Sequence, residues 1–185
     1  MIYSKAISRE LKYCGKNFYL RSPMMLEGEK YISIGDNFDG FSRIRLEAFD
    51  KHLNKRYSPQ INIGNNVSIN NDCHIGCVNS IIIGNNVLIA SRVFITDHFH
   101  GEIQFDELET PPNQRPVTSK GPIKIEDNVW IGEGVAIMPN VTIGENAIIG
   151  ANSVVTRDIP KNSVAVGIPA KVIKILKKEK VSYEQ

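Results

Sequence analysis

The stretch that decides the fold is "IEDNVWIGEGVAIMPNVTIGENAIIGANSVVTRDIP", residues 125–160. It divides into six units of six residues, and each unit begins with Ile or Val. The fifth residue of most units is small or apolar, and Gly, Asn or Pro stands between these positions. A fixed short period of this kind indicates a repeat architecture, in which each unit packs on its neighbours.

The period favours short strands over helices. Apolar residues recur at i, i+4 and i+6, whereas an amphipathic helix needs them at i, i+3, i+4 and i+7. Gly, Asn and Pro inside the units also disfavour a helix. Three short strands separated by turns would form one coil of a triangular β-solenoid, with the first residue of each unit inside the prism. Asn and Gly suit the corners because they accept positive φ.

The same phase occurs earlier in the chain. Further units begin at Ile63, Ile69 and Ile75, then at Ile83, Ile89 and Ile95, and a weaker copy begins at Ile34. Two segments with loop composition interrupt the repeat, at 50–60 and at about 97–121. We therefore expect an N-terminal cap segment over 1–30 and a repeat β-helix over 31–166. A short basic helix and tail are expected over 167–185, with the helix at 167–180.

Composition places limits on the partners and the location. The chain has 185 residues, with 22 Lys and Arg against 20 Asp and Glu, so it lacks the basic footprint of a nucleic-acid-binding protein. It contains no apolar run of about 20 residues, so no integral membrane segment is expected. Residues 1–16 lack the apolar core of a signal peptide. Three cysteines do not suggest a disulfide framework, and we expect free thiols in a cytoplasmic protein.

Two stretches carry a resemblance to a known family: "IGNNVLIASRVFITDHFHG" (83–101) and "KGPIKIEDNVWIGEGVAIMPNVTIGENAIIGANSVVTRDIPKNSVAVGIPAKVIK" (120–174). With the loop between them, they resemble the hexapeptide-repeat acyltransferases. Within that family they are similar to the maltose/galactoside O-acetyltransferases and the sugar O-acetyltransferases of polysaccharide clusters. The resemblance implies a left-handed parallel β-helix, although the general preference for right-handed crossovers would predict the opposite hand.

The resemblance also implies an assembly and substrates. The expected assembly is a homotrimer with active sites between subunits. The expected acyl donor is acetyl-CoA, used as a substrate and without a metal or prosthetic group. The expected acceptor is a hydroxyl of a sugar or glycan precursor. Such a transfer needs a base with a pKa near neutrality, a donor for the oxyanion and close positioning of two substrates.

The segment "FITDHFHG" (94–101) supplies the candidate base. A histidine meets that need without a large pKa shift, and the resemblance makes His98 the general base. Asp97 would orient the imidazole or contact the acceptor, and His100 is a secondary contact or a bystander. Asn70 and, more weakly, Glu47 would bind the acceptor. The structural alternatives are a polar corner histidine, a turn-forming Asp and a corner Asn.

The expected CoA-binding residues lie in the C-terminal coils. Trp130 would flank the pantetheine arm or pack at an interface. Glycines at 132 and 134 would leave room for the thioester, and Ala151 would offer backbone hydrogen bonds. Basic and hydroxyl side chains would meet the phosphates, unless they form a solvated face. The full set is Trp130, Gly132, Glu133, Gly134, Ala151, Thr156, Arg157, Lys171 and Lys174. Glu133 stands where many relatives have Ser, so a backbone N–H is the expected oxyanion donor.

Three other functions remain open. The chain could be an N-acetyltransferase of an amino sugar or small amine, because the fold and the CoA groove do not separate the two reactions. It could resemble the γ-class carbonic anhydrases, which bind Zn with three histidines, although the spacing of His98 and His100 does not match. It could be a non-catalytic solenoid. Cys73 occupies an inward position and forms no CxxC pair with Cys77, so no metal site is expected.

Overall fold

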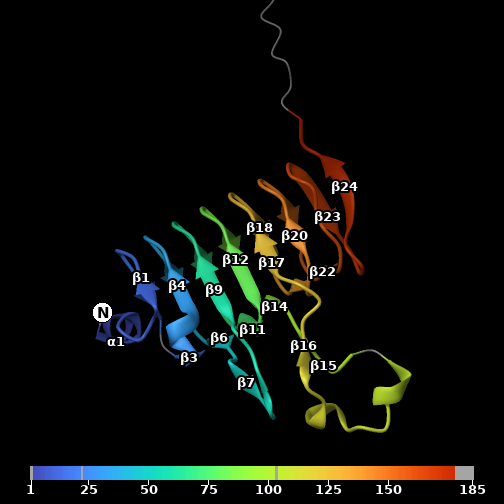
Figure 1. Ribbon diagram of the computed structural model, residues 1–185. Coiled ribbons are helices and arrows are strands. Elements are labelled where there is room, and N and C mark those ends of the chain that lie inside the picture. Colours follow the sequence, from blue (N-terminus) through green and yellow to red (C-terminus); the bar gives the residue numbers. More distant parts are fainter. Residues whose placement is uncertain (1, 22, 103, 178–185) are drawn as a thin grey trace, which may run out of the picture.

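The computed structural model describes residues 2–21, 23–102 and 104–177, which form a parallel β-helix of short strands (Figure 1). The predicted β-solenoid is confirmed. Three sheets form the sides of the prism, and successive strands of the chain pass from one sheet to the next. Each turn around the prism therefore adds one strand to every sheet.

In each of the three sheets, the strands follow one another along the prism. The first sheet holds β1 (Tyr13–Cys14), β4 (Ile32–Ile34), β9 (Gln60–Ile63), β12 (Ser80–Ile83), β17 (Ile123–Ile125) and β20 (Thr142–Ile143). The second sheet holds β2 (Tyr19–Leu20), β5 (Asp39–Gly40), β10 (Ser68–Ile69), β13 (Leu88–Ile89), β18 (Trp130–Ile131), β21 (Ile148–Ile149), β23 (Ser163–Val166) and β24 (Lys171–Ile175). The third sheet holds β3 (Met24–Glu27), β6 (Ile44–Ala48), β11 (His74–Cys77), β14 (Phe94–Thr96), β19 (Ala136–Ile137) and β22 (Val154–Val155).

The core is a set of stacked aliphatic columns. In the third sheet, Ile75 pairs with Ile95, Ile95 with Ile137, and Ile137 with Val155, and all four side chains are fully buried. Equivalent columns run inside the other two sheets. Burying one such side chain contributes about 1.5–3 kcal/mol relative to leaving it exposed. The repeat of Ile and Val every six residues is thus the sequence record of these columns.

Asparagines form a ladder along one corner of the prism. Asn17, Asn37, Asn66, Asn86 and Asn128 all have positive φ, from 56° to 60°. Each side-chain Nδ2 in the ladder donates to Oδ1 of the Asn one coil further on, over 2.8–3.0 Å. Asn tolerates this left-handed conformation better than most residues do, because its short polar side chain bonds locally. The predicted Asn corners are therefore confirmed.

The N-terminal segment differs from the predicted cap. Residues 13–27 supply β1, β2 and β3, which form a complete additional coil, so the β-helix begins well before residue 31. Only α1 (Ile2–Ser8) lies across that end. The buried Ser4 hydroxyl accepts a hydrogen bond from the Leu20 N–H over 3.0 Å and so ties α1 to the first coil.

The predicted C-terminal helix is wrong where the structure describes it. Residues 171–175 form β24, which pairs antiparallel with β23. The segment "KVIKI" is rich in β-branched residues, which favour strands. An unpaired β23 would also leave a row of backbone groups open at the sheet edge, and β24 covers them. Residues 178–180 of the predicted helix lie outside the described part of the chain.

Two excursions leave the prism at neighbouring points. The first is the hairpin of β7 (Lys51–His52) and β8 (Lys55–Arg56). The second contains the hairpin of β15 (Phe99–His100) and β16 (Val117–Thr118), together with short 3-10 turns at Phe105–Glu107 and Pro112–Gln114. A third 3-10 turn, Glu29–Tyr31, precedes β4. Tyr57 joins the two excursions, because its hydroxyl donates to the Val117 carbonyl over 2.7 Å. Among the described helices, none has the length and apolar content to cross a bilayer.

Candidate active site

His98 stands where the chain leaves the third sheet. It follows β14 by two residues, and the second excursion begins directly after it. Its side chain is 13% exposed, so the ring is largely enclosed but reachable. The edge of Phe49 faces it, with ring centroids 6.0 Å apart. The fold therefore gives this histidine a fixed, sheltered position at a corner of the prism.

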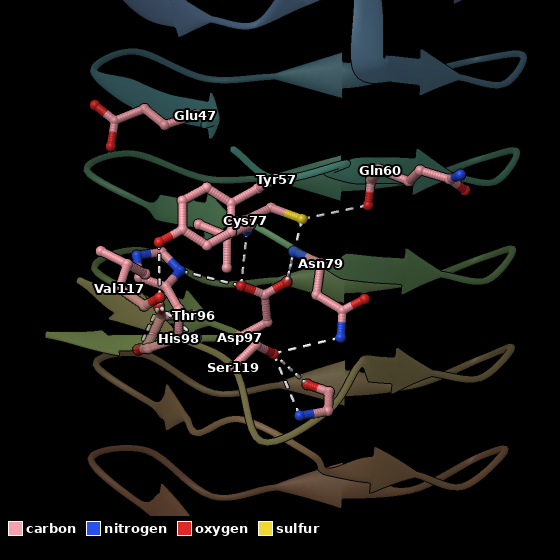
Figure 2. A network of polar contacts seen from close by, with 12 residues as sticks. Glu47, Tyr57, Gln60, Cys77, Asn79, Thr96, Asp97, His98, Val117 and Ser119 are labelled. Atoms are coloured by element: carbon pink, nitrogen blue, oxygen red, sulfur yellow. Dashed lines mark hydrogen bonds and ion pairs between the residues drawn. The ribbon is translucent and has the colours of Figure 1, made fainter. Parts of the chain in front are cut away.

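Asp97 is fully buried and surrounded by donors (Figure 2). Its Oδ1 accepts from the Val78 N–H over 2.9 Å and from His98 Nδ1 over 3.0 Å. Its Oδ2 accepts from the Asn79 N–H over 2.8 Å and from the Cys77 thiol over 3.3 Å. Burial acts to raise the pKa of Asp97, but the hydrogen bonds from His98 and the two backbone N–H groups outweigh it and hold the pKa below its usual range.

This arrangement fixes the tautomer of His98. An ionised carboxylate only accepts hydrogen bonds, so Nδ1 carries the proton that points to Asp97. Nε2 is then the basic nitrogen, and it bonds to no described residue. The Thr96 hydroxyl lies 3.2 Å from Nδ1 and also contacts the His98 backbone, which further restricts the ring. A carboxylate that orients and charges a histidine in this way is the usual support of a general base.

Several supporting residues were not predicted from the sequence. Thr96, Cys77 and the backbone of Val78 and Asn79 hold the pair in place from neighbouring coils. The only local signal was the two-residue insertion at 81–82, which places the turn at 78–79 against Asp97. Burial and the neighbouring Asp97 carboxylate raise the pKa of Cys77, so this thiol stays protonated and donates.

Glu47 lies on the same sheet but is not free. Its carboxylate is 2% exposed. It accepts two hydrogen bonds from Arg45 through Oε1 and one through Oε2, over 2.9–3.2 Å, and His74 Nε2 donates to Oε2 over 2.7 Å. Both oxygens are therefore occupied within the chain. The predicted direct contact between Glu47 and an acceptor remains a prediction, and the observed bonds do not favour it.

Asn70 is far from His98 along the third sheet. It precedes β11, and its backbone N–H donates to Ile89 O over 2.9 Å, at the corner between the second and third sheets. His98 follows β14, at the opposite edge of the third sheet. One chain therefore does not bring the two residues together.

The expected CoA residues lie on two different sides of the prism. Trp130 is on β18 in the second sheet and is 50% exposed. It shares an outward row with Ile148, Val164 and Lys174 through the strand registers. Lys171 lies on the same strand as Lys174, and both are exposed. This row presents an apolar surface that ends in basic side chains.

The remaining members of the set occupy corners. Thr156 and Arg157 are exposed and follow Val155, which shares a column with Ile95, so they lie on the same edge as His98. Ala151 is exposed at the corner between the second and third sheets. The structure thus separates Trp130 from His98 and places Thr156 and Arg157 nearer to it.

The two glycines near Trp130 have structural causes. A Cβ on Gly132 would lie 2.7 Å from the Ala151 backbone nitrogen. Gly134 has φ of 68°, and a Cβ there would meet the Asn152 side chain. Glu133 between them forms an ion pair with Arg92 over 2.6 Å. Because a carboxylate donates no proton when ionised, Glu133 does not supply the oxyanion donor.

His100 does not join the Asp97–His98 pair. It lies on β15, and its ring meets that of His52 edge-on, with centroids 5.4 Å apart. Burial and the neighbouring His52 and His98 lower the pKa of His100. Among the described residues, no three His, Cys, Asp or Glu side chains are grouped as metal ligands.

The fold and the site together define an acyltransferase of the hexapeptide type, and comparison with known proteins agrees. A family model described as bacterial transferase hexapeptide (six repeats) matches residues 122–157. The chain is 36% identical over 158 residues, covering 84% of itself and 77% of the relative, to WbbJ of Escherichia coli K12, whose name describes a lipopolysaccharide biosynthesis O-acetyl transferase. The chain belongs to the hexapeptide-repeat acetyltransferases. The family membership confirms the left-handed parallel β-helix.

Solved structures show the same architecture. AntD, an N-acyltransferase from Bacillus cereus crystallised with dTDP-4-amino-4,6-dideoxyglucose and coenzyme A, superposes with a TM-score of 0.78 at 25% identity, covering 95% of this chain and 90% of AntD. A maltose O-acetyltransferase from Clostridium difficile 630 superposes with a TM-score of 0.63 at 33% identity, covering 94% and 74%. The chain spans 51% to 64% of the length of four further curated relatives.

Proposed function

We propose that this protein is an acetyl-CoA-dependent O-acetyltransferase that modifies a hydroxyl of a sugar or glycan precursor, with His98 as the general base. The observation that carries the proposal is the buried Asp97, which holds His98 with Nε2 unbonded at the mouth of an excursion. Names of relatives support the substrate class, since they include an O-acetyl transferase of lipopolysaccharide biosynthesis and a galactoside O-acetyltransferase. A cytoplasmic location belongs to the same proposal.

The proposed chemistry is a direct transfer. His98 Nε2 takes the proton of the acceptor hydroxyl while its oxygen attacks the thioester carbon of acetyl-CoA. Asp97 stays ionised and stabilises the imidazolium that forms. A backbone N–H stabilises the oxyanion of the tetrahedral intermediate. The C–S bond then breaks, and the CoA sulfur takes the proton from His98. The products are the acetylated sugar and free CoA, and no covalent enzyme intermediate forms.

The donor would lie along the outward row of the second sheet. Neighbouring strands are about 4.8 Å apart, so Trp130 and Lys174 are separated by about 14 Å across three strand spacings. That row offers an apolar surface for a pantetheine arm and basic groups for phosphates. Ala151, Thr156, Arg157 and Lys171 keep the donor-binding roles that the resemblance implies.

The geometry supports a homotrimer with sites between subunits. His98 lies at the corner between the first and third sheets, and Trp130 lies on the second sheet, opposite that corner. Asn70 lies at a third place, the corner between the second and third sheets. A single prism therefore does not present all three to one pair of substrates, whereas neighbouring prisms around a three-fold axis would.

N-acetylation of an amino sugar is the alternative. The superposition with AntD, which is named an N-acyltransferase and holds an amino sugar nucleotide, favours it. An amine acceptor must lose a proton as it attacks, so the Asp97–His98 pair would serve that reaction equally well.

A thiol-release assay with acetyl-CoA separates these functions. The probes are matched pairs, methyl glycosides and their amino-sugar counterparts, with product masses checked before and after mild alkaline treatment that cleaves esters but not amides. Release with glycosides and an alkali-labile product supports O-acetylation. A preference for amino sugars with an alkali-stable product supports the alternative. Release with neither class would overturn the proposal.

A further inference from the structure

The third sheet carries a second carboxylate–histidine pair beside the first. His74 Nε2 lies 2.7 Å from Glu47 Oε2, and Glu47 is 2% exposed. Asp97 and His98 show the same organisation: a buried carboxylate holds one ring nitrogen of a more exposed histidine. Such a pair fixes a histidine in one orientation and one tautomer, which a surface residue of the prism does not need for folding.

The two rings lie against the same glycine. A Cβ built on Gly76 would be 3.3 Å from His98 Cε1 and 3.4 Å from His74 Nε2. Both ring atoms are therefore within 3.4 Å of one point above β11. Any side chain at position 76 would press on both rings. A ligand bound at His98 Nε2 is thus held directly beside His74.

His74 offers one free hydrogen-bond acceptor. Because the Glu47 carboxylate only accepts, Nε2 carries the proton of His74 and Nδ1 is the lone-pair nitrogen. Nδ1 bonds to no residue in the described part of the chain, and the side chain is 28% exposed. Arg45 balances the charge of Glu47 through its hydrogen bonds. Burial and the Arg45 charge also lower the pKa of His74, against the opposing effect of Glu47.

This local balance favours a hydroxyl over an anion. With Glu47 ionised and His74 neutral, the three side chains carry no net positive charge to attract a phosphate or carboxylate. A neutral imidazole nitrogen accepts well from a hydroxyl. Phe94 lies beside His74, with ring centroids 5.2 Å apart, and is 37% exposed. An apolar ring next to a hydrogen-bond acceptor suits the mixed surface of a sugar.

We propose that His74 is an acceptor-binding residue whose Nδ1 accepts a hydrogen bond from a second hydroxyl of the acceptor, next to the hydroxyl that His98 deprotonates. The enzyme then selects acceptors with two neighbouring free hydroxyls. Glu47 is a positioning residue that acts through His74, which accounts for its burial and its fully occupied oxygens. The inference rests on the proposed function and adds a substrate feature to it.

Two substitutions of His74 separate acceptor binding from a structural role. An asparagine oxygen falls near the position of Nδ1, and a glutamine amide reaches the position of Nε2. His74→Asn therefore keeps the acceptor for the hydroxyl and loses the bond to Glu47, whereas His74→Gln keeps the bond to Glu47 and loses the acceptor. The probes are methyl galactopyranoside and methyl glucopyranoside, each with its set of monodeoxy derivatives.

We expect wild type to lose about tenfold in kcat/KM when the hydroxyl next to the acetylated one is removed, the cost of one hydrogen bond. His74→Gln should lose about tenfold on the parent glycoside and little more on that deoxy derivative. His74→Asn should stay within about threefold of wild type. Equal losses in Asn and Gln, or a full further loss of His74→Gln on the deoxy derivative, would overturn the inference while leaving the proposed function standing. Failure of wild type to acetylate any glycoside would overturn both.

Discussion

Replacing Asp97 with Asn changes one buried atom and tests the support of His98. The Asp97–His98 contact is 3.0 Å and Asp97 is fully buried. At an effective dielectric constant of about 20, a carboxylate and an imidazolium at that distance attract by about 5 kcal/mol. If about half of this attraction is expressed in the transition state, kcat/KM falls about 100-fold. The amide also opposes its NH2 to a backbone N–H donor, so unfolding becomes about 2–4 kcal/mol easier.

The assay is thiol release at pH 7 with saturating acetyl-CoA, accompanied by thermal and urea unfolding. Asn79→Ala is the matched control, because it keeps the backbone N–H that donates to Asp97 and removes only an outer side chain. The pKa of Asp97 is depressed below 3.8, so its contribution to stability is present above that pH and is lost as the pH falls through the depressed value. The difference in stability between wild type and Asp97→Asn should shrink below about pH 3. Wild-type kcat/KM in a folded Asp97→Asn protein would refute the reasoning.

Three further predictions concern the corners, the excursions and metal. Asn86→Ala should cost about 1–2 kcal/mol in urea unfolding, because Ala resists positive φ and the amide ladder is broken; Asn86→Gly should recover part of this, and an equal loss in both variants would contradict the conformational argument. Tyr57→Phe removes the bond to Val117 and should lower kcat/KM for the acceptor about three- to tenfold with little change in Tm; unchanged kinetics would show that this tether does not position the excursion. Dialysis against EDTA should leave activity intact, whereas stoichiometric zinc bound by the histidines would contradict direct transfer by His98.

The sequence predicts the prism well because its core is periodic. Each column of Ile and Val appears as a six-residue spacing, and the Asn corners follow from one conformational need. The first coil is harder to find because its inward residues vary in type. Cys14, Leu20 and Leu26 are nevertheless six residues apart, and that spacing was the available signal. The strand at 171–175 was mistaken for a helix because a short basic and apolar segment fits both patterns.

The site was predictable only in part. His98 and Asp97 are neighbours in sequence, so the segment that contains them stands out. The pair of Glu47 and His74 is separated by 27 residues and meets through strand register, which the first excursion obscures. The same holds for the backbone donors at 78–79 that neutralise Asp97. Distances across coils depend on loop lengths, and spacing in the sequence does not encode them.

The central claim is that His98 Nε2 removes the proton of the acceptor. The most direct measurement compares His98→Ala with His100→Ala in acetyl transfer, with CoA binding followed by calorimetry. We predict that His98→Ala lowers kcat about 10²- to 10⁴-fold, the usual contribution of a general base, and leaves the Kd for CoA and the unfolding midpoint near wild type. His100→Ala should keep kcat within about threefold, because its ring packs on His52 and lies outside the Asp97 pair. Activity of His98→Ala within a few-fold of wild type would contradict the general-base role of His98.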